Sequence, residues 1–184
     1  KSRYDIDFDD YGICTYHPVT SEASEMGTQA SALFEALKRS ERNFVTILPN
    51  NDPGFKEIWE VIKALPKNQF RVIPSMRFSY FSELMKNSSA IVGNSSAGVR
   101  EAPFLGIPSL DIGSRQRARS AAASITNCQP NDTEKILNFL RNSWGNYYSR
   151  DESFGTGKTA EKFLKILNSS SFWKNNIQKI FNDC

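Results

Sequence analysis

The chain has 184 residues, 39% of them hydrophobic and 23% charged, and a formal net charge of +3. This length is enough to bury one well-formed core and too short for two large domains, so we expect one compact domain. The small net charge gives no argument for a nucleic-acid partner. No apolar run approaches the roughly 20 residues that cross a bilayer and no signal-peptide core begins the chain, so neither membrane insertion nor export is expected.

The three cysteines, Cys14, Cys128 and Cys184, are widely spaced and form no CxxC pair or Cys/His cluster. This spacing argues against a disulfide framework and against a structural metal site, and it favours a reducing, cytoplasmic setting. Residues 1–11 begin without an initiator methionine and contain an acidic, polar stretch from Asp5 to Asp10. We interpret them as a linker that enters from a missing domain.

Short apolar segments alternate with amphipathic ones along the rest of the chain. The β-prone runs predict strands at 12–16, 44–48, 70–73, 90–92, 108–112 and 124–127. Apolar residues at helical spacing predict helices at 26–37, 55–65, 80–86, 96–104, 133–140 and 160–167. The alternation predicts an α/β fold, a Rossmann-like parallel sheet with helices on both faces.

We expect residues 12–168 to form this domain and residues 169–184 to form a C-terminal tail. The tail contains the apolar residues Phe172, Trp173, Ile177 and Phe181. Side chains of this kind need a surface to pack on, such as an absent partner domain.

Ligands of an open parallel sheet bind at the carboxyl ends of its strands, so the loops that follow the strands are the place to look for a site. Four of these loops carry polar side chains. They are residues 17–20 (His-Pro-Val-Thr), 49–52 (Pro-Asn-Asn-Asp), 93–98 (Gly-Asn-Ser-Ser-Ala-Gly) and 113–119 (Gly-Ser-Arg-Gln-Arg-Ala-Arg).

The loop at 93–98 is the most specific of the four. A strand that runs through Ser95 and Ser96 into a helix directs free backbone N–H groups, two hydroxyls and the positive end of a helix dipole at one spot, which suits a phosphate. Glu101 follows in the helix, where its carboxylate can accept hydrogen bonds from a ribose diol. The alternatives are a serine that only caps the helix and a glutamate that only complements its dipole.

His17 and the basic loop at 113–119 are the other candidates. His17 is the only histidine, so it is the candidate for any imidazole proton transfer or phosphate contact, the alternative being a structural role. Arg115 and Arg119 can clamp a diphosphate through bidentate guanidinium contacts. They can equally belong to a solvated loop or to a weak RNA contact, although no aromatic stacking residues are interleaved with them.

Taken together, these loops resemble the C-terminal half of the hydrolysing UDP-N-acetylglucosamine 2-epimerases. The resemblance runs from about Gly12 to Leu167. It rests on His-Pro-Val-Thr at 17–20, Pro-Asn at 49–50, Gly-Asn-Ser-Ser-Ala-Gly-Val-Arg-Glu-Ala at 93–102, and Arg115-Gln116 with Arg119. Non-hydrolysing relatives typically carry His-Arg-Arg-Glu-Asn and Asp-Ser-Gly-Gly at the corresponding places, so the chain is more similar to the hydrolysing branch used for sialic-acid-type sugars.

The resemblance implies a two-domain architecture similar to the GT-B glycosyltransferases, with this chain as the C-terminal half and UDP in the cleft. It implies no cofactor, and a homo-oligomeric complete enzyme. The UDP-binding residues that it implies are Ser95 and Ser96 at the diphosphate, Glu101 at the ribose, His17, Asn50, Arg115 and Arg119 around the nucleotide, and Met76, Arg77 and Phe78 beside the uracil. Among these, His17 is the candidate catalytic residue.

The family reaction starts with anti elimination of UDP to a 2-acetamidoglucal, and water then adds to give free N-acetylmannosamine. The acidic residues implicated in proton transfer belong to an N-terminal domain that this chain lacks, so we expect the isolated chain to be inactive. Three rival functions stay open: a UDP-diacetylbacillosamine 2-epimerase, a nucleotide-sugar domain of a GT-B glycosyltransferase, and a non-catalytic binding module of the same fold.

Overall fold

The computed structural model describes residues 1–174 and 178. It divides the chain into two compact units, residues 1–151 and residues 152–184. The predicted domain, 12–168, therefore extends past the first compact unit, which ends at Asp151. The final helix, α7 (Thr159–Leu167), belongs to the second unit and has no buried residue.

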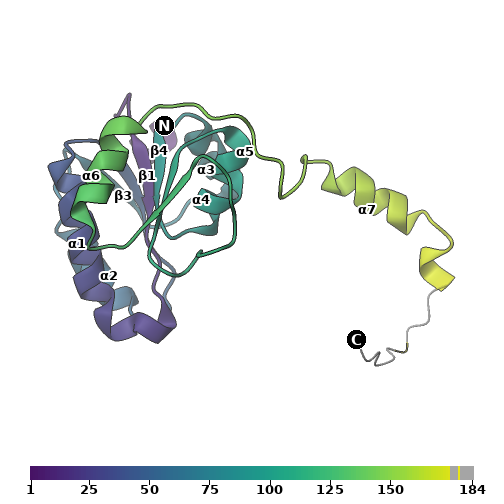
Figure 1. The fold of residues 1–184 in the computed structure, drawn as a ribbon, viewed down its shortest axis with the longest axis horizontal. Coiled ribbons are helices and arrows are strands. Elements are labelled where there is room, and N and C mark those ends of the chain that lie inside the picture. The colour runs from purple at the N-terminus through teal and green to yellow at the C-terminus, as the bar shows by residue number, and fades with distance from the viewer. Residues whose placement is uncertain (175–177, 179–184) are drawn as a thin grey trace. The chain divides into compact units, whose positions relative to one another are not determined.

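The first unit is built on one six-stranded sheet whose order is β3-β2-β1-β4-β5-β6 (Figure 1). Every neighbouring pair of strands is parallel. The strands are β1 (Gly12–Thr15), β2 (Phe44–Ile47), β3 (Phe70–Ile73), β4 (Ala90–Gly93), β5 (Ser109–Ile112) and β6 (Ile125–Cys128). The predicted fold class, an α/β parallel sheet, is confirmed.

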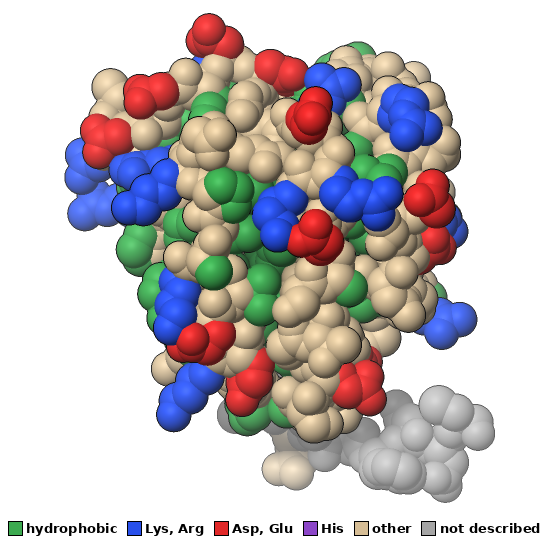
Figure 2. All heavy atoms as spheres, turned by 90° about the vertical axis from the view of Figure 1, so that its left-hand side faces the viewer, with side chains coloured by type: hydrophobic (Ala, Val, Ile, Leu, Met, Phe, Trp, Pro, Cys, Tyr) green, Lys and Arg blue, Asp and Glu red, His purple; other side chains and the backbone are tan. Residues whose placement is uncertain are grey.

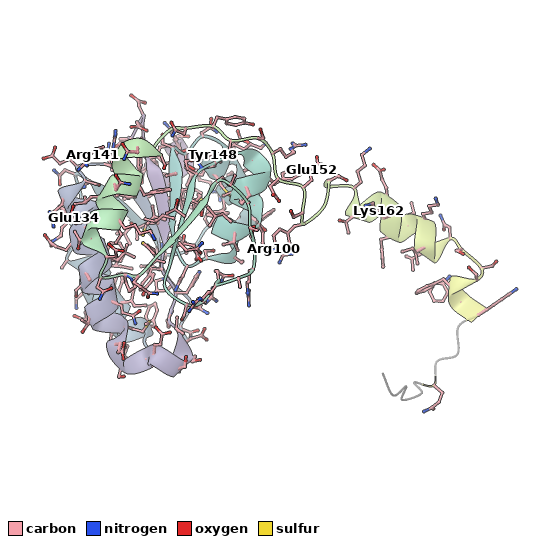
Figure 3. The ribbon with its side chains drawn as sticks, in the orientation of Figure 1. Arg100, Glu134, Arg141, Tyr148, Glu152 and Lys162 are labelled. Carbon is pink, nitrogen blue, oxygen red and sulfur yellow. The ribbon has the colours of Figure 1, made fainter. Side chains whose placement is uncertain are left out.

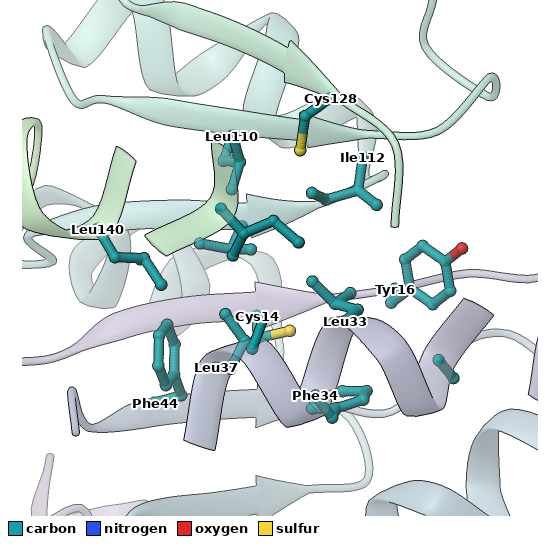
Figure 4. Packing of buried hydrophobic residues seen from close by; sticks show 14 of the residues in the cluster. Cys14, Tyr16, Leu33, Phe34, Leu37, Phe44, Leu110, Ile112, Cys128 and Leu140 are labelled. Atoms are coloured by element: carbon teal, nitrogen blue, oxygen red, sulfur yellow. The ribbon is translucent and has the colours of Figure 1, made fainter. Parts of the chain in front are cut away.

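Helices cover both faces of the sheet (Figure 1). One face carries α1 (Met26–Arg39), α2 (Phe55–Lys63) and α6 (Thr133–Asn142), and the other carries α3 (Phe78–Lys86), α4 (Ser96–Val99) and α5 (Glu101–Leu105). The core of the first face joins Leu33 and Leu37 of α1 to Leu110 and Leu140 (Figure 4). On its outer side, charges of both signs are interspersed (Figure 2), as expected of amphipathic helices with a solvated face.

The helix predicted at 96–104 consists of two short helices. The chain breaks at Arg100, whose φ and ψ are −116° and −61°, and α5 starts at Glu101. Pro103 explains the break, because it has no N–H for the carbonyl four residues earlier and fits a helix only in its first turn. The break leaves Glu101 in the first turn of its own helix.

The segment 1–11, which we expected to be a linker, belongs to the first unit and packs against the rest of it. Ile6 and Tyr11 are buried, and the Tyr11 hydroxyl donates a hydrogen bond to the Leu84 carbonyl at 2.9 Å. Tyr148, in the connection after α6 (Figure 3), also packs back, because its N–H donates to the Gly106 carbonyl at 2.8 Å.

In the second unit, a 3-10 helix (Phe172–Lys174) follows α7. The Trp173 indole N–H donates to the Leu167 carbonyl at 2.7 Å, and the Phe172 and Trp173 rings meet edge to face with centroids 5.1 Å apart. Ile177 and Phe181 of the predicted tail, and Cys184, lie outside the described residues. Cys14 and Cys128 are buried free thiols.

Candidate functional site

The strand order reverses its direction at β1. The chain passes from β1 to β2 and β3 on one side and then returns to place β4 on the other side. In a sheet of this kind, the crevice at the carboxyl ends of the two strands that flank the reversal is where ligands bind. Here these ends are followed by His17, after β1, and by Asn94, after β4.

Gly93 makes the two strand ends approach each other closely. Its φ is +128°, and an added Cβ would lie 2.1 Å from the Thr15 carbonyl oxygen. A side chain is therefore excluded by contact and by backbone conformation together. The glycine of the predicted phosphate loop is therefore needed for the close approach of the ends of β1 and β4, whether or not a ligand is bound.

Asn94 joins the loops around the crevice. Its Oδ1 accepts from the His17 N–H at 2.6 Å, and its Nδ2 donates to the His17 carbonyl at 2.8 Å. Its own carbonyl accepts from Arg115 Nη1 and from Gln116 Nε2, each at 3.1 Å. Asn94 is only 1% exposed, so one buried residue holds together the loops that follow β1, β4 and β5.

The turn at Ser95 and Ser96 is open to a ligand. Both residues are half-buried, and Ser95 caps α4 by accepting from the Ala97 N–H at 3.4 Å, a long contact. Within residues 1–174, the N–H groups of Ser95 and Ser96 and the Ser96 hydroxyl meet no hydrogen-bond partner. The capping alternative therefore accounts for Ser95 in part and leaves Ser96 unexplained.

His17 lies half-buried between the loops after β2 and β5. Its Nδ1 is 3.1 Å from Asn50 Oδ1 and 3.2 Å from the Asn50 N–H nitrogen. Burial first, and the Arg115 guanidinium second, lower the pKa of His17 below its ordinary value, while Asn50 and Asp52 oppose this shift. The ring is therefore held mainly uncharged near neutral pH.

Two carboxylates, one at the start of α5 and one in β5, have buried oxygens without a hydrogen-bond donor. One is Glu101, whose Oε2 is buried and unpartnered, as a group reserved for a hydroxyl ligand would be. The other is Asp111 of β5, which is paired in register with Gly93, is 2% exposed and has both oxygens unpartnered. Burial raises the pKa of Asp111 to about 6.

The structure brings together His17, Asn50 and Arg115, and it places the Ser95-Ser96 turn next to them through Asn94. No described contact joins these residues to Met76, Arg77 or Phe78, which follow β3. Phe78 is 67% exposed, whereas Met76 packs on the core and lines a separate cavity with the N-terminal segment. Arg119 is exposed, and its Nη1 donates to Gln116 Oε1 at 3.1 Å.

The prediction from sequence missed several residues that organise the site. Asn94 and the buried Gln116 were passed over because their partners are far away in the sequence. A second network connects Tyr16, Gln29, Glu22 and Ser114, and the Ser114 and Gln29 hydrogen bonds lower the pKa of Glu22. Asn94, Gln116 and Ser114 do lie inside the polar loops predicted from the sequence, whereas Gln29 lies within α1 and gave no such signal.

The described part of the chain contains no group of three His, Cys, Asp or Glu side chains arranged to hold a metal ion. No helix among the described residues is long and apolar enough to cross a membrane.

Comparison with known proteins places these features in a family. The chain is 37% identical over 187 residues to the UDP-N-acetylglucosamine 2-epimerase of Neisseria meningitidis serogroup B, covering 100% of this chain and 49% of that protein. It is 28% identical to the hydrolysing UDP-N,N'-diacetylbacillosamine 2-epimerase of Legionella pneumophila, covering 91% of this chain and 45% of that protein. The chain thus spans about half the length of these curated relatives.

Solved structures show the same fold. The UDP-N-acetylglucosamine 2-epimerase of Methanocaldococcus jannaschii in complex with UDP-GlcNAc and UDP aligns with a TM-score of 0.71 at 18% identity, over 90% of this chain and 47% of that one. A UDP-GlcNAc 2-epimerase of Neisseria meningitidis bound to UDP-GlcNAc, 18% identical to this chain, aligns with a TM-score of 0.69 over 94% of this chain and 47% of that one. The family model for UDP-N-acetylglucosamine 2-epimerase matches residues 1–168. The chain therefore belongs to the UDP-N-acetylglucosamine 2-epimerase family.

Proposed function

We propose that this chain is the UDP-binding, C-terminal domain of a hydrolysing UDP-N-acetylglucosamine 2-epimerase. Such an enzyme converts UDP-N-acetylglucosamine and water to N-acetylmannosamine and UDP, for the synthesis of sialic-acid-type sugars. The observation that carries the proposal is the turn after β4, where N–H groups of Ser95 and Ser96 without a partner in residues 1–174 lie beside the cationic Arg115.

The contacts support the assignment of different residues to the diphosphate, the ribose and the uracil of the nucleotide. The Ser95-Ser96 turn and Arg115 would bind the diphosphate, because unpaired N–H donors and a guanidinium complement phosphate oxygens. Glu101, with its unpartnered Oε2, would accept hydrogen bonds from the ribose hydroxyls. Phe78, with its exposed ring, and the neighbouring Met76 and Arg77 would border the uracil.

In the complete enzyme, these donors would stabilise the charge that develops on UDP as its bond to the sugar breaks. Within the described residues no carboxylate is hydrogen-bonded to His17, Ser96 or Arg115, so none is placed to move the sugar proton. We propose that the complementary domain supplies that proton transfer and that this chain alone binds UDP without turning over the sugar nucleotide.

Calorimetry on the 184-residue chain tests the binding step. UDP should bind saturably, and uridine, which has no phosphates, should bind at least about tenfold more weakly, which corresponds to one lost charged contact. Equal affinity for the two ligands, or no binding of UDP at millimolar concentration, would overturn the proposal.

The reaction is tested with the complete enzyme. Release of free N-acetylmannosamine with one UDP per turnover supports the hydrolysing epimerase. Recovery of UDP-N-acetylmannosamine would assign the non-hydrolysing reaction, and a new glycosidic bond on an acceptor would assign glycosyl transfer.

A further inference from the structure

Nδ1 of His17 lies opposite two groups of Asn50 that differ in hydrogen-bond character. The backbone N–H of Asn50 can only donate, and its nitrogen is 3.2 Å from Nδ1. The side-chain Oδ1 can only accept, and it is 3.1 Å from Nδ1. Nδ2 of the same amide donates to Asp52, and this hydrogen bond fixes the orientation of Oδ1.

The two contacts cannot both be hydrogen bonds at once. A bare Nδ1 accepts from the Asn50 N–H, and a protonated Nδ1 donates to Asn50 Oδ1. The loop after β2 therefore offers Nδ1 a partner whether or not this nitrogen carries a hydrogen. The other ring nitrogen, Nε2, meets no partner within residues 1–174.

The charged groups around the ring decide which state is populated. Burial disfavours the charged ring most and the Arg115 guanidinium acts in the same direction, whereas the Asn50 side chain and the Asp52 carboxylate act in the opposite direction. In the free chain the first two prevail. A bound diphosphate would add two negative charges between His17 and Arg115 and reverse this balance, because an opposite charge within a few ångströms favours the charged form.

We propose that His17 is a proton switch of the nucleotide site, uncharged in the free chain and protonated from solvent when a diphosphate binds, with Asn50 exchanging its backbone N–H for its side-chain oxygen as the partner of Nδ1. The proton adds to the Nδ1 lone pair and no other bond is broken. Nε2 carries its hydrogen in both states, and in the charged ring it donates to a phosphate oxygen. The inference rests on the proposed UDP binding and adds that His17 takes up one proton when UDP binds.

Proton uptake makes affinity depend on pH. Binding should strengthen as pH falls through the interval between the pKa of His17 in the free chain and its pKa in the complex. Each unit between those two values corresponds to about a tenfold gain in affinity from the alkaline to the acidic side of the interval. UDP-N-acetylglucosamine is the suitable probe, because neither phosphate of its diphosphate diester titrates near neutral pH.

The ring signals of His17 report the switch without assignment work, since the chain contains one histidine. Its pKa is measured by NMR in the free chain and in the chain saturated with UDP-N-acetylglucosamine. We expect a rise of at least about one unit on binding. An unchanged pKa in a chain whose amides at 95–101 do shift with ligand would overturn the switch and leave the UDP site standing. Absence of any amide shift at millimolar ligand would contradict the UDP site and the switch together.

Asn50→Ala separates the two partners, because it keeps the backbone N–H and removes Oδ1. The pKa of His17 in the complex should fall, and the pH at which binding begins to strengthen should fall with it. Asn51→Ala, at the adjacent exposed asparagine, is the matched control and should leave both pKa values in place. A bound-state pKa that Asn50→Ala does not move would contradict the role of Oδ1.

Discussion

Asn94 and His17 are joined across the ends of β4 and β1 by two hydrogen bonds that run in opposite directions. His17 N–H donates to Asn94 Oδ1 at 2.6 Å, and Asn94 Nδ2 donates to the His17 carbonyl at 2.8 Å. A side-chain amide is the group that can do both, because it carries an acceptor and a donor side by side. The pair fixes the backbone of the only histidine, and with it the position of its ring.

Asn94→Asp tests this pairing. The variant keeps an acceptor for the His17 N–H and loses the donor to the His17 carbonyl, so a buried charge faces a carbonyl oxygen. We expect the free energy of unfolding to fall by about 1–3 kcal/mol, and the ring signals of His17 to shift. Urea unfolding and NMR measure the two effects. Asn68→Asp, at an exposed position, should change neither, and a variant at Asn94 that behaves like this control would refute the role of the pair.

Gly93→Ala tests the close approach of β4 to β1. The added methyl would lie 2.1 Å from the Thr15 carbonyl oxygen at a φ of +128°. We therefore expect the free energy of unfolding to fall by about 2–4 kcal/mol, or the variant to fail to fold. Gly113→Ala is the matched control, because its φ is also positive, +81°, but nothing lies within 4 Å of the added carbon. The control should cost only about 1 kcal/mol. Equal losses in urea unfolding would show that the contact with Thr15 is unimportant.

Asp111 makes stability depend on pH. Its pKa is raised to about 6 in the folded chain by burial, whereas an aspartate in the unfolded chain titrates near about 4. The unfolded state therefore loses its proton first, and the stability contributed by protonated Asp111 is present below about pH 4 and is lost as pH rises through about 6. The free energy of unfolding of Asp111→Asn, measured relative to that of the unmodified chain, should therefore rise by on the order of 1–3 kcal/mol as pH rises from 4.5 to 8.

The measurement for Asp111 is the free energy of unfolding of both chains at the two pH values. Asp7→Asn removes an exposed aspartate and controls for the change of net charge. A difference between Asp111→Asn and the unmodified chain that stays constant with pH would show that Asp111 does not titrate in this range.

Ser96→Ala tests the diphosphate contact in the complete enzyme and in this chain. Removal of one hydroxyl that has no protein partner should weaken UDP binding by roughly 1–3 kcal/mol, with little change in stability. Calorimetry and urea unfolding separate the two quantities. Ser31→Ala, on the exposed side of α1, should leave UDP affinity unchanged. A loss of stability that matches the loss of affinity would assign Ser96 a structural role.

Local pattern predicted most of the sheet. The strand at 70–73 begins and ends where the sequence placed it, and the others differ by one or two residues. The predictions were weaker where packing decides the outcome. On α6, Phe139 is buried and Leu137 is only half-buried, a difference that helical spacing alone does not predict. The helix predicted at 96–104 was wrong as a single helix, since Pro103 ends the run of backbone hydrogen bonds.

The sequence predicted which loops form the site, but not the hydrogen bonds that connect these loops. The topology of a parallel sheet explains why loops 17–20 and 93–98 meet, since β1 and β4 are neighbours. The Asn94 contacts to His17, 77 residues away in the sequence, and the Gln116 contact to Asn94 have no local pattern. They depend on side-chain placement in the folded chain, which periodicity does not encode.

The central claim is that UDP binds at the ends of β1 and β4, and amide chemical shifts of the labelled 184-residue chain test it most directly. On addition of UDP, the account predicts the largest shifts at Ser95, Ser96 and His17, and none at the opposite ends of the strands, such as Phe44 and Phe70. Saturable shifts confined to any other surface, with Ser95 and Ser96 unmoved, would contradict it.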